Sequence, residues 1–356
     1  MEGKYDYKDH KRHDLSSVTR FEKMLDQNAH YFFDVEEFEE IIDHYLFEDD
    51  ISKAKKAQGY ALSQHPNSSE LLIKKARILA DLKKPNEALK LIARVETIEP
   101  ANPELLVLKG NIHSQQQEHH KAIKCYRSAM NASNEKDYLL MCIAFEYQSI
   151  GNYKRAIKLL KKALNENPEN EIALYELSFC FEAEGVLEEG AAYIQCYLDA
   201  HPYSLAGWYN LGICYSKMDC HEKAIEAYDY AIAIDEAFAS PYFNKAHAMA
   251  EMGRFEEAIE LLKETFKYEE PESFTYFYIG ECFEKKGDYK NAIKNYKIAA
   301  ALDPEFPETF QSLGRLFNLL GNQTKAIRCI EKAINIDPGN SESWRLRAVI
   351  MQNTVS

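Results

Sequence analysis

The chain has 356 residues and a formal net charge of −14 at pH 7. At this length a single compact core would be unusual, so we expect either several domains or an extended repeat array. The acidic balance argues against a surface that binds the phosphates of a nucleic acid.

The N-terminal segment, residues 1–34, combines a charged stretch with one short helical pattern. Residues 1–16 lack apolar periodicity, and we expect them to be disordered or loosely attached. Four apolar residues at helical spacing predict a short helix that covers the first repeat: Val18, Phe21, Met24 and Leu25. Neither a secretory signal nor an apolar run of membrane-spanning length is found, so no membrane insertion is expected.

Three columns of residues recur with a step of 34 between residues 35 and 340. The small-residue column contains Ala54, Ala88, Ala122, Ala156, Gly190, Ala224, Ala258, Ala292 and Ala326. The glycine column contains Gly151, Gly185, Gly253, Gly287 and Gly321, with Asp219 at the remaining step. The proline column contains Pro66, Pro100, Pro168, Pro202, Pro304 and Pro338.

Each column has a physical role in a helical hairpin. Small side chains let two helices approach closely, and glycine ends a helix in the left-handed conformation without a clash. Asp is among the few other residues that tolerate that conformation, which accounts for Asp219. Proline suits the loop between hairpins because it cannot continue a helix. The columns therefore predict nine helix-turn-helix units over residues 35–340.

The first unit, residues 35–68, begins with an acidic helix that contains Asp34, Glu36, Glu37, Glu39, Glu40 and Asp43. One interpretation is a docking face for a basic partner. The other is that carboxylates suit the positive end of a helix and the solvated face of a terminal repeat.

The stretch from Leu205 to Phe238 carries the most specific motif of the chain. Its signature residues are Trp208, Leu211, Gly212, Tyr215, Ala224, Tyr228 and Ala231. This order resembles the tetratricopeptide repeat (TPR), a helix-turn-helix unit of 34 residues. The resemblance implies an all-α fold, an α-solenoid of TPR hairpins that forms a right-handed superhelix with a concave groove for peptides. Residues 341–356 are expected to form a capping helix with Trp344, Ala348 and Met351 inward and Glu342, Arg345 and Gln352 outward.

An aromatic stripe lies one residue beyond the core-facing stripe of the first helices. By resemblance to TPR proteins, this second stripe lines the groove and contacts the bound peptide. The candidate groove residues are Phe145, Tyr175, Phe179, Tyr209, Asn210, Phe243, Asn244, His247 and Phe277. The rings would stack on a peptide, and the two asparagines would present amides to its backbone. The alternative is that the rings pack between neighbouring repeats, as helical aromatic stripes often do.

Other binding and catalytic chemistry is poorly supported. TPR domains that hold an acidic chaperone tail need a fuller set than Lys74, Arg77 and Asn111 provide, so such binding is not predicted. Phosphate-binding loops, zinc-protease motifs and nucleophile elbows are absent from the sequence. His113, His119 and His120 lie together without a ligand spacing typical of a metal site. We therefore predict no catalytic residues, no metal and no cofactor.

The eight cysteines contain no C-x-x-C pair, and several fall in repeat columns as small apolar side chains. Reduced cysteines favour a cytoplasmic location. The prediction is a cytoplasmic, non-enzymatic scaffold or adaptor that binds a peptide segment of a protein partner and no nucleic acid. Two alternatives stay open, a peptide-responsive regulator and an accessory subunit of an enzyme or secretion complex.

Overall fold

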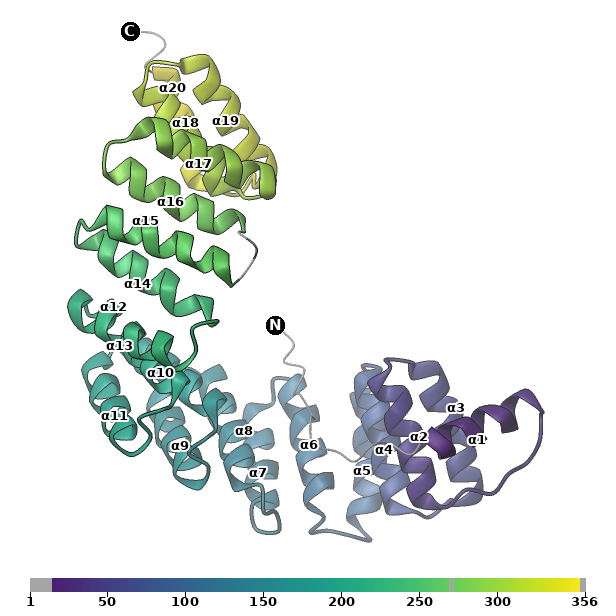
Figure 1. Cartoon of the computed structure of the whole chain (residues 1–356). Helices are drawn as coiled ribbons and strands as arrows, with labels where there is room; N and C mark the ends of the chain where they lie inside the picture. Colours follow the sequence, from purple (N-terminus) through teal and green to yellow (C-terminus); the bar gives the residue numbers. More distant parts are fainter. Residues whose placement is uncertain (1–14, 269, 271, 353–356) are drawn as a thin grey trace. The chain divides into compact units, whose positions relative to one another are not determined.

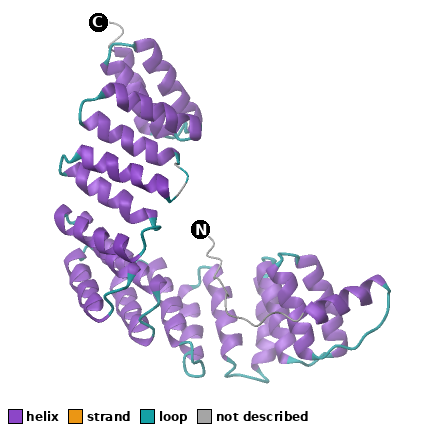
Figure 2. Ribbon diagram, viewed as in Figure 1, coloured by secondary structure: helices purple, strands orange, loops and turns teal. Residues whose placement is uncertain are grey.

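The computed structural model describes residues 15–268, 270 and 272–352, and every regular element in that part of the chain is a helix (Figures 1 and 2). The predicted class, an all-α array of helical hairpins, is confirmed. The expectation of a disordered start falls almost wholly on residues 1–14, which lie outside the described part. The chain forms two compact units, residues 1–173 and 174–356, with the division inside the first turn of α10 (Glu171–Glu184).

The N-terminal unit consists of α1 and four hairpins. Its helices are α1 (Leu15–Asp26), α2 (Val35–Phe47), α3 (Ile51–Gln64), α4 (Ser69–Asp81), α5 (Pro85–Glu96), α6 (Pro103–Gln115), α7 (His119–Ala129), α8 (Lys136–Ser149) and α9 (Tyr153–Glu166). Helices that follow one another in the chain pack against each other.

The C-terminal unit continues the same alternation after α10. Its helices are α11 (Leu187–Ala200), α12 (Leu205–Lys217), α13 (His221–Ile234), α14 (Ala239–Glu251), α15 (Phe255–Glu264), the 3₁₀ turn η1 (Thr265–Lys267), α16 (Ser273–Lys285), α17 (Tyr289–Leu302), α18 (Pro307–Leu319), α19 (Gln323–Ile336) and α20 (Ser341–Gln352).

The turn inside each hairpin has one backbone geometry throughout the chain. Positive φ angles recur every 34 residues at Asp49, Lys83, Gln117, Gly151, Gly185, Asp219, Gly253, Gly287 and Gly321. Each turn closes with a bond across six residues, as from the Asn152 N–H to the Tyr147 carbonyl at 2.8 Å. This is the Schellman closure of a helix end. The expected left-handed conformation of Asp219 is confirmed, and three non-glycine residues adopt it in the first three hairpins.

The small-residue column lies where the two helices of each hairpin touch. All eight of its alanines are fully buried. Gly190 is also buried, and a Cβ at this position would lie 2.8 Å from the ring of Phe181. The column therefore changes from alanine to glycine here because Phe181 occupies the space that a methyl group would need.

Helix α20 packs with a different face from the one expected, so the inward assignment of Trp344, Ala348 and Met351 was wrong. These three residues are exposed, and Ser343 and Ile350 are buried instead. The Trp344 indole N–H donates to the Pro338 carbonyl at 3.0 Å, which holds the ring over the preceding loop. Ile350 instead contacts the α19 core, so the helix is rotated by about one residue, roughly 100°.

Candidate peptide-binding surface

The candidate surface lies on the first helices of successive hairpins in the C-terminal unit, α10, α12, α14 and α16. The core-facing stripe is buried as expected, for example at Leu174, Ser178 and Phe181 on α10. Residues one position further along the helix point about 100° away from that core. The candidate rings occupy this second position, and their exposure differs from helix to helix.

On α10 the stripe is open. Tyr175 is 36% exposed and Phe179 is 52% exposed. The Tyr175 ring meets the edge of Tyr209 on α12, with ring centroids 6.3 Å apart. Tyr209 is half-buried, and its hydroxyl accepts a hydrogen bond from the Asn244 amide on α14 at 3.1 Å. These contacts link three successive first helices into one aromatic and polar surface.

Helices α14 and α16 enclose a pocket of about 190 Å³ next to these residues. Three candidates, Phe243, Asn244 and His247, line it from α14. Phe243 is half-buried and packs on Phe274 at 4.8 Å, so it forms an apolar wall. The side chain of His247 is exposed and stands 4.0 Å from Glu251. The pocket thus combines an apolar wall with a polar rim, as small binding sites commonly do.

Seven residues of this pocket were not among the candidates, and three of them carry a hydroxyl or a charged group. Tyr278, Glu281 and Lys285 line it from α16. Burial raises the pKa of Glu281, and the nearby Lys285 opposes that rise. Lys285 also donates to Glu251 at 2.7 Å, and this hydrogen bond lowers the pKa of the Glu251 carboxyl. The column of Glu281 contains Phe145, Phe179, Ile213 and His247 before it and Arg315 after it, so the change to a carboxylate was the sequence signal at this position.

Two candidates are not accessible to a peptide. Phe277 is only 9% exposed and packs against Tyr296 and Phe306, with ring centroids 5.4 and 5.0 Å away. Asn210 is 2% exposed, and its amide donates to the Ala206 carbonyl of its own helix at 2.8 Å. Both residues serve packing and are left out of the proposed surface.

The loop before the next hairpin places a second aromatic residue against two of the four rings. Phe238 contacts Tyr209 at 5.2 Å, and Phe306 contacts Phe277 at the same sequence offset. The equivalent loop positions after the other two rings carry Ser204 and Glu272. The loop contact alone does not set the exposure, because Tyr209 and Phe243 are both half-buried and Phe243 packs on Phe274 instead.

Phe145 belongs to the N-terminal unit, where it lies half-buried on α8. Its assignment to a peptide groove stays a prediction.

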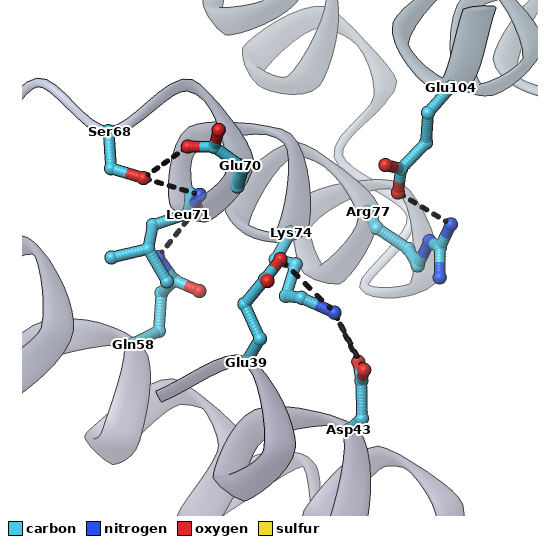
Figure 3. A network of polar contacts seen from close by, with 9 residues as sticks. All are labelled: Glu39, Asp43, Gln58, Ser68, Glu70, Leu71, Lys74, Arg77 and Glu104. Atoms are coloured by element: carbon cyan, nitrogen blue, oxygen red, sulfur yellow. Dashed lines mark hydrogen bonds and ion pairs between the residues drawn. The ribbon is translucent and has the colours of Figure 1, made fainter. Parts of the chain in front are cut away.

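The residues that resemble part of a carboxylate clamp are occupied within the N-terminal unit. Figure 3 shows Lys74 of α4 between two acidic residues of α2, with its Nζ 2.6 Å from Asp43 and 3.8 Å from Glu39. Arg77 pairs with Glu104 of α6 at 3.3 Å (Figure 3). The Asn111 side-chain oxygen accepts from the Tyr126 hydroxyl at 2.8 Å. Lys74 and Arg77 therefore join neighbouring hairpins to one another, whereas Asn111 bonds to the second helix of its own hairpin.

The histidines and the helix lengths of the described residues bear on metal binding and on membrane crossing. The described residues contain no group of three or more His, Cys, Asp or Glu placed to hold a metal ion. His113 and His119 are paired with carboxylates, Glu118 at 2.6 Å and Glu146 at 2.7 Å. Across the helices from α1 to α20, none is both long and apolar enough to cross a bilayer.

Comparison with known proteins agrees with the hairpin geometry. Models of the tetratricopeptide repeat match residues 103–136, 146–204, 206–238, 239–270, 273–306 and 307–340. The chain belongs to the TPR family, whose arrays serve as protein-interaction scaffolds. No curated protein matches the sequence significantly.

Several solved structures are similar to this chain. The MamA protein is 25% identical, with 49% of this chain and 94% of that one covered and a TM-score of 0.41. A tetratricopeptide repeat protein from Parabacteroides merdae is 21% identical, with 70% and 98% covered and a TM-score of 0.46. The Cut9–Hcn1 hetero-tetramer of the APC/C matches at 15% identity, with 94% and 68% covered and a TM-score of 0.48.

Proposed function

We propose that this protein is a scaffold or adaptor that binds a peptide segment of a partner protein on the C-terminal unit. The peptide would lie along the surface formed by Tyr175, Phe179, Tyr209, Asn244 and His247, with one side chain in the α14–α16 pocket. The cytoplasmic location, the lack of catalysis and the lack of a nucleic-acid partner stay predictions from cysteine usage, motif content and charge.

One observation carries this proposal. Three residues chosen as groove candidates, Phe243, Asn244 and His247, line a single pocket between neighbouring first helices. Exposed rings on α10 continue the apolar surface, and aromatic residues are enriched where binding energy concentrates. Main-chain groups of an extended peptide would find donors and acceptors in Asn244, His247 and Glu281.

The test is a peptide selection from a random library with the full-length protein as bait. Binding of the selected peptides is then measured by fluorescence anisotropy with Phe179→Ala, His247→Ala and Tyr278→Ala. These side chains are exposed, so their removal should leave the fold intact. We expect each variant to weaken binding by roughly fivefold to thirtyfold, the range for interface residues of substantial weight.

Tyr203→Ala is the matched control because Tyr203 is a highly exposed aromatic residue outside this surface. It should change affinity by less than about twofold. Equal losses of affinity for Tyr203→Ala and Phe179→Ala would contradict the proposed surface. So would selected peptides whose binding is unchanged in all three variants.

A further inference from the structure

The N-terminal unit contains a second pocket, of about 360 Å³, with a different chemistry. It lies at α7 and α8 and is lined by His120, Ile123, Lys124, Arg127, Ser128, Asn131 and Tyr147. Six of these seven side chains can donate a hydrogen bond, and none is a carboxylate. In a chain with a net charge of −14, such a lining is unexpected.

The donors are brought together by helical spacing. His120, Lys124, Arg127 and Asn131 follow one another at steps of four, three and four residues, which aligns them along one face of α7 and the turn after it. Ile123 and the buried ring of Tyr147 form the pocket's apolar wall. The polar groups therefore point from one helix face toward a fixed aromatic ring.

Two guanidinium groups converge on the Tyr147 hydroxyl. Arg127 of α7 donates its Nη2 to this oxygen at 3.1 Å, and Arg155 of α9 donates its Nη1 at 3.5 Å. The Arg155 guanidinium also lies 5.3 Å from the centre of the Tyr147 ring. A neutral hydroxyl orients the two cations but does not neutralise them, so the site keeps its positive charge.

Carboxylates close by are committed to other residues. Glu146 binds His119 at 2.7 Å, and Glu118 binds His113 and Lys121. Among the described residues, Arg127 and Arg155 form no ion pair with an acidic side chain. Residues 119–166 contain nine Lys and Arg against four Asp and Glu, which leaves this segment positive in an acidic protein.

We propose that the α7–α8 pocket, with Arg155 of α9 beside it, binds a phosphoryl group, either as a free anion or as a phosphorylated side chain of a partner. Arginine presents forked donors that match phosphate oxygens, and a phosphate monoester carries nearly two negative charges at neutral pH. Lys124, Ser128 and Asn131 supply donors for the remaining oxygens. This site is separate from the aromatic surface of the C-terminal unit and does not rest on the proposed peptide binding.

Calorimetric titration of the full-length protein tests the proposal with four probes. These are inorganic phosphate, sulfate, a short Ala/Gly peptide with one phosphoserine, and the same peptide with glutamate in its place. We expect saturable binding of the phosphorylated probes and at least tenfold weaker binding in Arg127→Gln and in Lys124→Gln. Tyr147→Phe should weaken binding by a smaller factor, because the two guanidinium groups lose the hydroxyl that orients them. Circular dichroism verifies that each variant is folded.

The matched control is the double variant with Lys158→Gln and Lys162→Gln, since both lysines are exposed on α9 and neither lines the pocket. This variant should bind within about twofold of the wild type after allowance for salt screening. Tighter binding of the phosphopeptide than of phosphate identifies a phosphorylated partner, and equal binding identifies a free anion. Equal loss in the control, equal binding of the glutamate peptide, or a lack of saturation would each overturn the proposal.

Discussion

Lys74 is the residue where charge most directly supports the packing of two hairpins. Its side chain is mostly buried, and its ammonium group lies between Asp43 and Glu39 of the preceding hairpin (Figure 3). Burial raises the pKa of Glu39, and the charge of Lys74 counteracts that rise. A carboxyl whose pKa is raised in the folded state makes its most favourable contribution to the free energy of unfolding at low pH, where it is protonated. That contribution is lost as the pH rises through the folded-state pKa.

Lys74→Met should therefore destabilise the N-terminal unit at pH 7. We expect a loss of about 1–2 kcal/mol in the free energy of unfolding, below the value for a fully buried pair because both carboxylates are partly exposed. The loss should shrink as the pH falls toward the unfolded-state pKa of Glu39, because the unpaired carboxyl becomes protonated. Urea unfolding at several pH values measures this.

Lys75→Met is the control for Lys74→Met, since Lys75 is exposed on the same helix. Its effect should be small at every pH. A loss for Lys74→Met that stays constant from pH 4 to pH 7 would contradict the role assigned to Glu39.

At the scale of the helix, α1 acts as the cover of the first hairpin. Phe21 is fully buried, and its ring lies 5.9 Å from Phe33 and 5.8 Å from Tyr60. Arg20 fixes the orientation of α1 through an ion pair with Glu37 at 2.7 Å and a position 4.2 Å over the Phe33 ring. Such a cover matters because an apolar hairpin face that packs against no neighbouring repeat would be exposed to water.

Phe21→Ala should remove the main apolar contact of α1. A cost of about 3–4 kcal/mol is expected for a buried phenylalanine that leaves a cavity. Hydrogen exchange should speed up in α1 and α2 first, because detachment of α1 exposes the face of α2. Phe32→Ala, at an exposed neighbouring phenylalanine, should cost less than about 0.5 kcal/mol. Similar exchange rates in the two variants would show that α1 is not held by Phe21.

In the molecule as a whole, packing is local along the chain. Helices contact mainly their immediate neighbours in sequence, and separate apolar clusters follow one another within each unit. In repeat proteins of this kind, stability is a sum of repeat and nearest-neighbour terms. A local defect should consequently loosen nearby hairpins and leave remote ones protected.

Gly280→Ala tests this local behaviour. A Cβ at Gly280 would lie 2.7 Å from the ring of Tyr296, which is fully buried and whose hydroxyl is bonded to Glu284 at 2.8 Å. Because that ring has no room to move, we expect a destabilisation of about 1–3 kcal/mol. Hydrogen exchange should accelerate in α15–α18, while α2–α5 keep their wild-type protection.

Gly59→Ala serves as the comparison, because a Cβ at Gly59 meets nothing within 4 Å and the residue lies inside a helix. It should be neutral or stabilising by up to about 1 kcal/mol. Uniform acceleration of exchange along the whole chain in Gly280→Ala would indicate a single cooperative unit instead.

The sequence by itself determined the repeating hairpin. Its step of 34 residues, the small residues between helices and the left-handed turns all appear in the structure, Asp219 included. These features depend on backbone geometry and on contacts inside one hairpin, so a local pattern carries them. The left-handed turns at Lys83 and Gln117 had no sequence signal, because the six-residue closure imposes that conformation on side chains that do not favour it.

Only the tertiary structure decided which surfaces are open. Phe277 is covered by Phe306 and Asn210 is bonded to its own helix, although both occupy columns that a repeat pattern assigns to the groove. The rotation of α20 was likewise decided only by the tertiary structure, as was the convergence of Arg127 and Arg155 on the Tyr147 hydroxyl. Each depends on side chains that neighbouring elements bring together, and a period in sequence specifies where a residue lies on its helix but not what covers it.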